Sequence, residues 1–261
     1  MKLAGKRIIV TGSSRGIGAE TCRELANEGA LVIVNANSDI EEAIIVANEI
    51  NLQQKKEVAF AIQANIAIEE EAERLINESA DLLGGIDILI NNAGIESTVA
   101  ALDLDMAEWD RIMSVNLRGA FICARAAARK MIAQGSKGVI LNNSSIHESV
   151  SRLGLMHYCV SKSGLRMMSK ALALEWAEYG IRVLGIAPGA IETQTNKEEI
   201  AAFGRGKFED WIPLSRLGNC ADIAKVISFL VSKDASYITG TTLEIDGGYS
   251  LNLVRYDPRQ E

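Results

Sequence analysis

Short apolar runs alternate with longer amphipathic stretches along most of this chain. The apolar runs are rich in valine and isoleucine, and they predict seven strands, at 7–11, 31–35, 58–63, 86–91, 139–143, 181–187 and 242–245. The stretches between them carry apolar residues at helical spacing and predict helices at 16–28, 39–52, 69–83, 106–133 (in one or two pieces), 156–179 and 222–232. Residues 192–217 lack this regularity and are predicted to form a lid-like segment before the last helix.

Strands that alternate with helices of this length indicate a parallel sheet with helices on both faces. The near-continuous apolar strands agree with that arrangement, because both faces of such a sheet are buried. Right-handed crossovers then give a doubly wound α/β fold. Since no linker, repeat or low-complexity stretch interrupts the pattern, residues 1–261 are predicted to form a single domain. Ligands of such sheets bind beyond the carboxyl ends of the strands, so the loops there are the places to look for chemistry.

Composition narrows the function classes. The chain has 34 acidic and 27 basic side chains and no basic run, which argues against a nucleic-acid partner. It lacks an apolar stretch long enough for a membrane helix, and its first residues do not resemble a signal peptide. Two histidines and four widely spaced cysteines argue against a metal site. We therefore expect a cytoplasmic protein with reduced thiols, no metal and a small-molecule substrate.

A glycine-rich turn, Thr-Gly-Ser-Ser-Arg-Gly-Ile-Gly, follows the first predicted strand and leads directly into a helix. Its glycines are Gly12, Gly16 and Gly18. Glycine lets the backbone approach a pyrophosphate closely, and the N–H groups at a helix start favour that anion. The turn alone is also compatible with a tight strand-to-helix connection, and its first two glycines are farther apart than in the usual dinucleotide fingerprint.

Three further motifs follow in order: Asn91-Asn92-Ala93-Gly94 after the fourth strand, Tyr158-x-x-x-Lys162, and Pro188-Gly189 after the sixth strand. Together with residues 11–18, this ordered set resembles the short-chain dehydrogenase/reductase family over essentially the whole chain. The resemblance implies a Rossmann-type fold, an NAD(P)-dependent oxidoreductase and a homotetramer. It also implies that the cofactor contacts Gly12, Ser14, Arg15, Gly16, Ile17, Gly18, Asn37, Ser38, Asn65, Ile66, Asn92, Ala93, Gly94, Tyr158, Lys162, Pro188, Gly189, Ile191 and Thr193.

The end of the second strand bears on the choice between NAD and NADP. Enzymes that prefer NAD place an acid there to hold the ribose hydroxyls, but this chain has none before Asp39. Arg15, with Asn37 and Ser38, suits a 2′-phosphate, which carries roughly two negative charges. NADP is therefore favoured, and NAD remains possible because Arg15 is also compatible with a solvated loop arginine. Asn65 stands where the family usually has an aspartate that contacts adenine, and its amide oxygen retains the ability to accept a hydrogen bond.

Tyr158 and Lys162 are four residues apart in a predicted helix, so their side chains share one face. A phenol titrates near ~10 and is a poor base at neutral pH. One ammonium at ~4 Å, with an effective dielectric of ~20, supplies about 4 kcal/mol, enough to lower that pKa by about three units. We therefore expect Lys162 to keep Tyr158 partly ionised, so that the phenol can take a proton from an alcohol.

The remaining catalytic assignments are implied by the resemblance. Ser145 precedes Tyr158 at the family's spacing and is expected to hydrogen-bond the substrate oxygen. Ser144 is adjacent, and the residues alone do not separate the two. Asn116 matches the family's structural and proton-relay asparagine, which completes the catalytic set of Ser145, Tyr158, Lys162 and Asn116.

Polar side chains also surround the expected substrate position: Glu96, Ser145, His147 and Asn196, with Glu148 next to His147. A site built to pair hydroxyl groups suits a polyhydroxylated substrate. The strings at 92–96 and 144–148 resemble the bacterial glucose 1-dehydrogenases of the family, which implies oxidation of glucose at carbon 1 to the lactone. Two alternative functions are a carbonyl reductase of the 3-oxoacyl-carrier-protein type and a non-catalytic cofactor-binding regulator. His147 and Glu148 are also compatible with solvated loop positions that do not contact substrate. Asn143 departs from the family, which usually has an apolar residue there.

Overall fold

One parallel sheet organises the computed structural model, which describes residues 1–194 and 196–251. Its seven strands lie in the order β3-β2-β1-β4-β5-β6-β9. They are β1 (Arg7–Val10), β2 (Leu31–Ala36), β3 (Ala59–Gln63), β4 (Ile88–Asn91), β5 (Val139–Asn143), β6 (Arg182–Pro188) and β9 (Thr242–Ile245). The strand order runs outward from β1 in both directions, so the direction of winding reverses between β1 and β4. This confirms the predicted doubly wound sheet and places its ligand crevice at that reversal.

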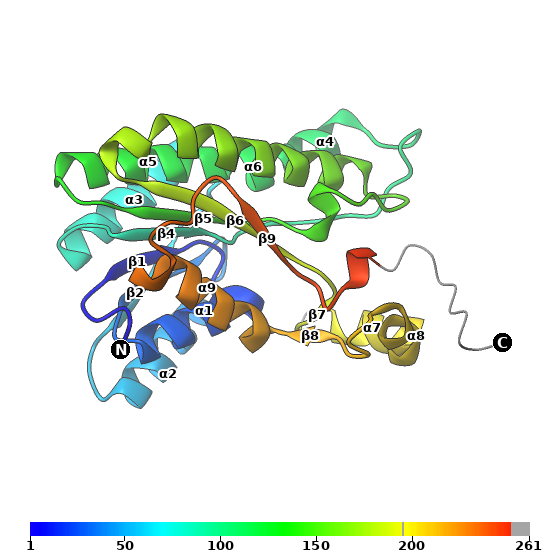
Figure 1. Cartoon of the computed structure of the whole chain (residues 1–261), viewed down its shortest axis with the longest axis horizontal. Helices are drawn as coiled ribbons and strands as arrows, with labels where there is room; N and C mark the ends of the chain where they lie inside the picture. Colours follow the sequence, from blue (N-terminus) through cyan, green and yellow to red (C-terminus); the bar gives the residue numbers. More distant parts are fainter. Residues whose placement is uncertain (195, 252–261) are drawn as a thin grey trace.

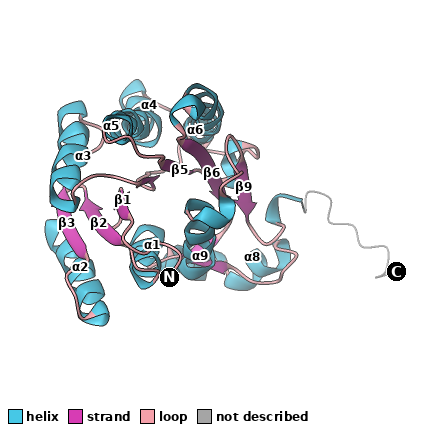
Figure 2. Ribbon diagram, turned by 60° about the vertical axis from the view of Figure 1, so that its left-hand side comes forward, coloured by secondary structure: helices cyan, strands magenta, loops and turns pink. Residues whose placement is uncertain are grey.

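Helices cover both faces of the sheet (Figure 1, Figure 2). They are α1 (Gly16–Asn27), α2 (Ile40–Gln54), α3 (Glu69–Leu83), α4 (Met106–Met113), α5 (Ala120–Ala133), α6 (Met156–Glu175), α7 (Lys197–Phe203), α8 (Arg205–Trp211) and α9 (Cys220–Val231). Helices α3 to α6 lie on one side, and α1, α2 and α9 lie on the other. Along β1, Ile8 and Val10 pack into one core and Ile9 into the other, and all three are fully buried. Burial on both faces explains why the strands appear as continuous apolar runs.

The long fourth crossover is interrupted. Between α4 and α5 lies a π-helical turn, Ser114–Gly119, so the stretch predicted in one or two pieces consists of two α-helices. A Cβ on Gly119 would lie 2.6 Å from the backbone oxygen of Ile66, so only glycine allows this approach. The turn carries Asn116, which is buried. Single π turns inside helices are frequent at functional sites.

The lid-like segment is more regular than predicted. It contains α7 and α8, and it is held at its base by β7 (Ile191–Glu192), which pairs in parallel with β8 (Gly218–Asn219). The segment has its own small core of Ile200, Ile212 and Leu217, and it lies beyond one end of the main sheet (Figure 1). Each helix has only seven residues, too few for a clear helical period in the sequence. Residue 195 of this segment, and the tail at 252–261, lie outside the described residues.

No helix among the described residues combines the length and hydrophobicity that a bilayer crossing requires.

Candidate active site

A cleft of about 440 Å³ lies at the carboxyl ends of β1, β2 and β4, where the winding reverses. Thirteen of the predicted cofactor residues line it: Gly12, Ser14, Arg15, Ile17, Gly18, Asn37, Ser38, Asn65, Ile66, Asn92, Ala93, Gly94 and Thr193. The cleft also includes side chains that the sequence did not single out as cofactor contacts, among them Asn35, Glu42 and Asn143. These polar residues come from strand ends and a helix face that become neighbours only in the folded sheet.

The glycine turn forms a cradle that larger residues would fill. A Cβ on Gly18 would lie 2.5 Å from Nδ2 of Asn92, and one on Gly12 would lie 2.7 Å from Cα of Ala93. The Asn92 amide donates to the backbone oxygens of Thr11 and Gly12, at 3.0 and 2.9 Å. At the start of α1, the side chain of the N-cap residue, Arg15, makes no capping hydrogen bond. A helix start of this kind, facing a cradle of glycine backbone, fits the pyrophosphate of a dinucleotide.

The adenosine end of the cleft holds charges of both signs. Arg15 is exposed there, and Asp39 and Glu42 line the same end. Both carboxylates already have protein partners, since Asp39 accepts from the backbone N–H of Glu41 at 3.0 Å and Glu42 accepts from the Ser14 hydroxyl at 3.0 Å. Arg15 is therefore the side chain at this end that suits a phosphate, while the two acids reduce the local positive potential.

Asn65 lies in the cleft as predicted, but its amide oxygen already has one donor. That oxygen accepts from the backbone N–H of Ala67 at 3.0 Å, and the backbone N–H of Asn65 donates to Glu71 at 2.7 Å. A carbonyl oxygen has two lone pairs, so the position retains one acceptor for an adenine amine.

Tyr158 and Lys162 share one face of α6, as their spacing predicts. The Lys162 ammonium lies 5.5 Å from the centre of the Tyr158 ring and donates to the backbone oxygen of Asn143 at 2.9 Å. Lys162 is almost completely buried. Burial lowers its pKa to about 8, although the charges of Glu96 and Glu148 oppose this change.

The predicted direction of the Tyr158 pKa is wrong for the surroundings that the protein's own residues provide. Burial raises this pKa, the negative charge of Glu96 raises it further, and a hydrogen bond from Ser145 opposes both. The loss of water around the phenol outweighs the attraction of Lys162, from which the opposite direction was predicted. With these residues alone around it, the phenol is protonated at neutral pH. It is ready to donate a proton to a carbonyl, and it needs a further positive charge to take one from an alcohol.

The structure separates the two adjacent serines. Ser145 Oγ hydrogen-bonds Tyr158 and accepts from the backbone N–H of His147 at 3.2 Å. The Ser144 hydroxyl instead points to the backbone oxygen of Lys162, at 3.4 Å. Ser145 is therefore the serine at the phenol.

His147 lies beside the phenol and Glu148 does not. The two rings of His147 and Tyr158 meet edge-on with their centres 6.1 Å apart. His147 Nδ1 lies 2.8 Å from the backbone oxygen of Val150, which can only accept, so Nδ1 carries a proton and donates it to that oxygen. Glu148 is buried against Arg166, 3.4 Å from its Nε, and burial raises the pKa of this carboxyl.

Two asparagines predicted in the site hold loops. Asn116 accepts from the backbone N–H of Ile95 and donates to its oxygen, both at 2.8 Å, and also donates to Ser161 at 3.1 Å. Asn196 accepts from the backbone N–H of Thr193 and donates to the oxygen of Ile191, both at 2.8 Å. Their amides therefore fix the backbone on either side of the cleft.

Asn143 is the polar residue of the cleft whose role the sequence missed. It was visible only as a departure from the family's apolar position. Its amide donates to Oδ1 of Asn92 at 2.9 Å, and so links the end of β5 to the residue that holds the glycine turn. Of the described residues, no group of three or more His, Cys, Asp or Glu side chains is arranged to hold a metal ion.

A dinucleotide cleft that opens onto a half-buried tyrosine and a buried lysine is the arrangement of a nicotinamide-dependent oxidoreductase. Residues 12–250 match a family model described as enoyl-(acyl carrier protein) reductase. The chain belongs to the short-chain dehydrogenase/reductase family and is an NAD(P)-dependent oxidoreductase of that family.

Several characterised relatives match nearly the whole chain. It is 40% identical to 3beta-hydroxysteroid dehydrogenase 1 of Eggerthella lenta, over 95% of both chains. It is 36% identical to glucose 1-dehydrogenase 2 of Bacillus subtilis, over 95% of this chain and 96% of the relative. It is 38% identical to the 3-oxoacyl-[acyl-carrier-protein] reductase FabG of Aquifex aeolicus, over 95% of this chain and 98% of the relative.

Among solved structures, the chain resembles a gluconate 5-dehydrogenase from Burkholderia cenocepacia, crystallised with NADP and tartrate. The TM-score is 0.88, with 34% sequence identity over 96% of this chain and 97% of that chain.

Proposed function

We propose that the protein oxidises a polyhydroxylated substrate, glucose or a related aldose, at carbon 1 to the lactone. The observation that carries this proposal is the His147 ring, which lies edge-on to Tyr158 and whose backbone N–H donates to Ser145 Oγ. Glu96 acts electrostatically on the same tyrosine and adds an acceptor for hydroxyl groups. The proposed substrate contacts are Glu96, Ser145 and His147, with Asn196 acting by holding the loop at Thr193.

In the proposed mechanism, the nicotinamide of the bound cofactor supplies the hydride acceptor. Ser145 hydrogen-bonds the reacting oxygen of the substrate, and Tyr158 takes its hydroxyl proton. Lys162 contributes one positive charge beside the phenol and would hold the nicotinamide ribose, and the positively charged oxidised nicotinamide would supply the further charge that the phenol needs. Asn116 keeps the loop at Ile95 over the site, which agrees with both of its hydrogen bonds to that residue.

A dehydrogenase assay over a panel of sugars, simple alcohols, hydroxysteroids and 3-oxoacyl thioesters tests the substrate class. We expect the highest kcat/KM for an aldose, measured by the absorbance of the reduced cofactor. A higher kcat/KM for a 3-oxoacyl thioester would favour the carbonyl reductase alternative, which the FabG relative supports. A higher value for a hydroxysteroid would also contradict the sugar proposal.

For the cofactor, we propose that NADP is preferred and NAD is accepted. The exposed guanidinium of Arg15 supports the preference, and the nearby Asp39 and Glu42 explain why it is not absolute. Arg15→Ala is expected to lower kcat/KM for NADP about tenfold and to leave that for NAD within about twofold, because an ion pair to a phosphate contributes on the order of 1.5 kcal/mol. Wild-type protein that strongly prefers NAD would contradict the assignment.

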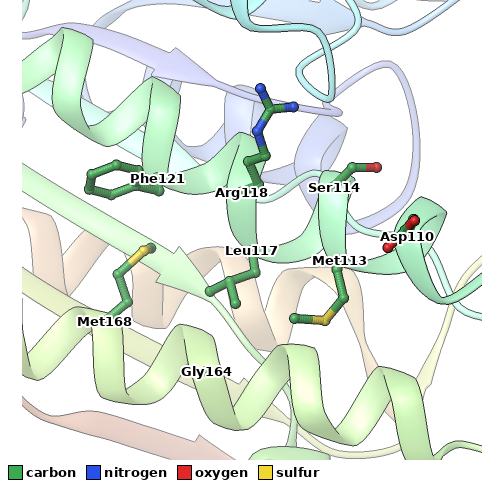
Figure 3. A pocket seen from close by; sticks show the side chains of 8 residues that line it. All are labelled: Asp110, Met113, Ser114, Leu117, Arg118, Phe121, Gly164 and Met168. Atoms are coloured by element: carbon green, nitrogen blue, oxygen red, sulfur yellow. The ribbon is translucent and has the colours of Figure 1, made fainter.

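We propose a homotetramer in which a second copy covers an apolar groove between the π turn, α5 and α6. The groove, of about 670 Å³, is drawn in Figure 3 and is lined by Asp110, Met113, Ser114, Leu117, Arg118, Phe121, Gly164 and Met168. Leu117 and Met113 point toward α6, and a Cβ on Gly164 would lie 2.9 Å from Leu117 Cδ2. Light scattering of the native protein, which measures molar mass, tests this state.

We also propose that residues 192–217 close over bound substrate and that the protein works in the cytoplasm. Gly204, with φ of 104°, separates the two lid helices at a conformation that favours glycine, which supports movement there. All four cysteines are free thiols, which supports a reducing compartment.

A further inference from the structure

The loop between β4 and α4 carries Glu96 to the mouth of the site, yet residues 92–100 have no regular secondary structure. Its position therefore depends on individual hydrogen bonds. Asn116 fixes Ile95 on one side of Glu96. Farther along, the backbone N–H of Val99 donates to Gly154 at 2.9 Å.

On the other side of Glu96, Ser97 joins two ionisable residues from different helices. Its hydroxyl hydrogen-bonds the carboxylate of Glu108 on α4 and lies 2.9 Å from Nε2 of His157 on α6. A carboxylate can only accept, so the Ser97 proton points to Glu108. Nε2 of His157 must then carry a proton and donate to Ser97. His157 therefore donates to Ser97, and Ser97 donates to Glu108.

The two residues at the ends of this series of hydrogen bonds, Glu108 and His157, are both held in place. Arg111 hydrogen-bonds both carboxylate oxygens of Glu108, at 2.6 and 2.8 Å, and together with Ser97 it lowers the pKa of Glu108 to about 2. His157 is fully buried, and its other nitrogen, Nδ1, has no hydrogen-bond partner among the described residues. Its donation to Ser97 is therefore the hydrogen bond through which this buried ring acts on the loop.

We infer that His157 is a positioning residue which, through Ser97 and Glu108, clamps the loop so that Glu96 stays beside Tyr158. The inference rests on the proposed function, because it assigns Glu96 a place at that site. Glu96 is the residue between the two fixed positions, Ile95 and Ser97. Its immediate neighbours in sequence are both tied, so its backbone has little freedom to leave the site mouth.

The position of Glu96 matters because its charge raises the pKa of both Tyr158 and Lys162. The other polar or titratable groups that face the phenol are Ser145 and His147, from the segment after β5, and Cys159 and Lys162, from α6. If the clamp is released, the exposed carboxylate of Glu96 moves farther from the phenol, and its charge acts on Tyr158 more weakly. The pKa of Tyr158 then falls, and the acidic limb of the oxidation profile, where activity rises as Tyr158 loses its proton, moves to lower pH.

A double-mutant cycle between Ser97 and Glu96 tests this. Ser97→Ala is expected to lower kcat/KM about five- to tenfold, the usual effect of losing such hydrogen bonds, and to move the acidic limb to lower pH with cofactor affinity unchanged. Glu96→Gln is expected to move the limb in the same direction, and the double variant to show no further movement. Thr98→Ala, at the exposed neighbouring position, is the matched control and should leave the profile unchanged. Additive shifts in the double variant, or an unmoved limb in Ser97→Ala, would overturn the inference.

A second measurement does not depend on activity or substrate. Amide hydrogen exchange across 95–99 should speed up in Ser97→Ala and His157→Leu, and stay close to the wild-type rate in His157→Gln, whose amide provides a donor near the Nε2 position. Equal protection in all these variants would contradict the clamp. Any alcohol that is oxidised serves for the pH profile, so failure to oxidise sugars would count against the proposed function and leave this test intact.

Discussion

Tyr158→Phe is expected to reduce kcat about 10³-fold, because the phenol is the proposed group that exchanges a proton with the substrate oxygen. Phenylalanine keeps the ring that packs edge-on against His147, so the fold and the cleft should persist. The affinity for the reduced cofactor, followed by its fluorescence, should change less than about threefold. Single-turnover measurement of hydride transfer gives the rate without the influence of product release.

A variant at Ser144, the residue next to Ser145, serves as a control for the loss of a hydroxyl group close to the site. Ser144→Ala is the control, since that hydroxyl faces the Lys162 backbone and not the phenol, and it should retain most of the wild-type rate. If Tyr158→Phe transferred hydride within tenfold of the wild-type rate, the proton-transfer role would belong to another residue.

The catalytic geometry was predictable because it is local. Tyr158 and Lys162 share a helix face by the helical period alone, and the glycine turn occupies the first strand-to-helix connection, where the fold places its anion site. The sheet was predictable for a similar reason. Strands buried on both faces leave a continuous apolar signal that needs no knowledge of their neighbours.

The ionisation of the site was not predictable, because it depends on residues that are distant in sequence. Burial of the phenol and the charge of Glu96 decide the direction of its pKa, and Glu96 lies in a loop that folding brings to α6. The contact of Ser97 with His157 spans 60 residues and leaves no periodic trace in the sequence. The same limit applies to Asn143 and Asn92, whose amides meet only because β4 and β5 are adjacent.

Lys162→Met is expected to make the cofactor-free protein more stable at pH 7 while removing nearly all activity. Burial lowers the pKa of Lys162 from 10.5 to about 8, so below pH 8 the folded protein carries the cost of a buried ammonium. Removing the buried charge therefore stabilises the folded protein by roughly 3 kcal/mol. Losing the hydrogen bond to the Asn143 oxygen destabilises it by about 1 kcal/mol. Methionine has a similar length and no charge, so the thermal midpoint should rise by about 4–8 °C.

The pH dependence of the stability difference between Lys162→Met and the wild type shows whether the buried charge or packing causes it. Between the folded pKa, about 8, and the unfolded value of 10.5, the unfolded lysine binds more protons than the folded one, so the wild-type protein gains stability as pH rises. The advantage of Lys162→Met should therefore shrink between pH 7 and about pH 10, as measured by calorimetry. Lys170→Met, at an exposed position of the same helix, should show no such trend. A stability difference that stayed constant with pH would assign the effect to packing and would contradict the explanation by the buried charge of Lys162.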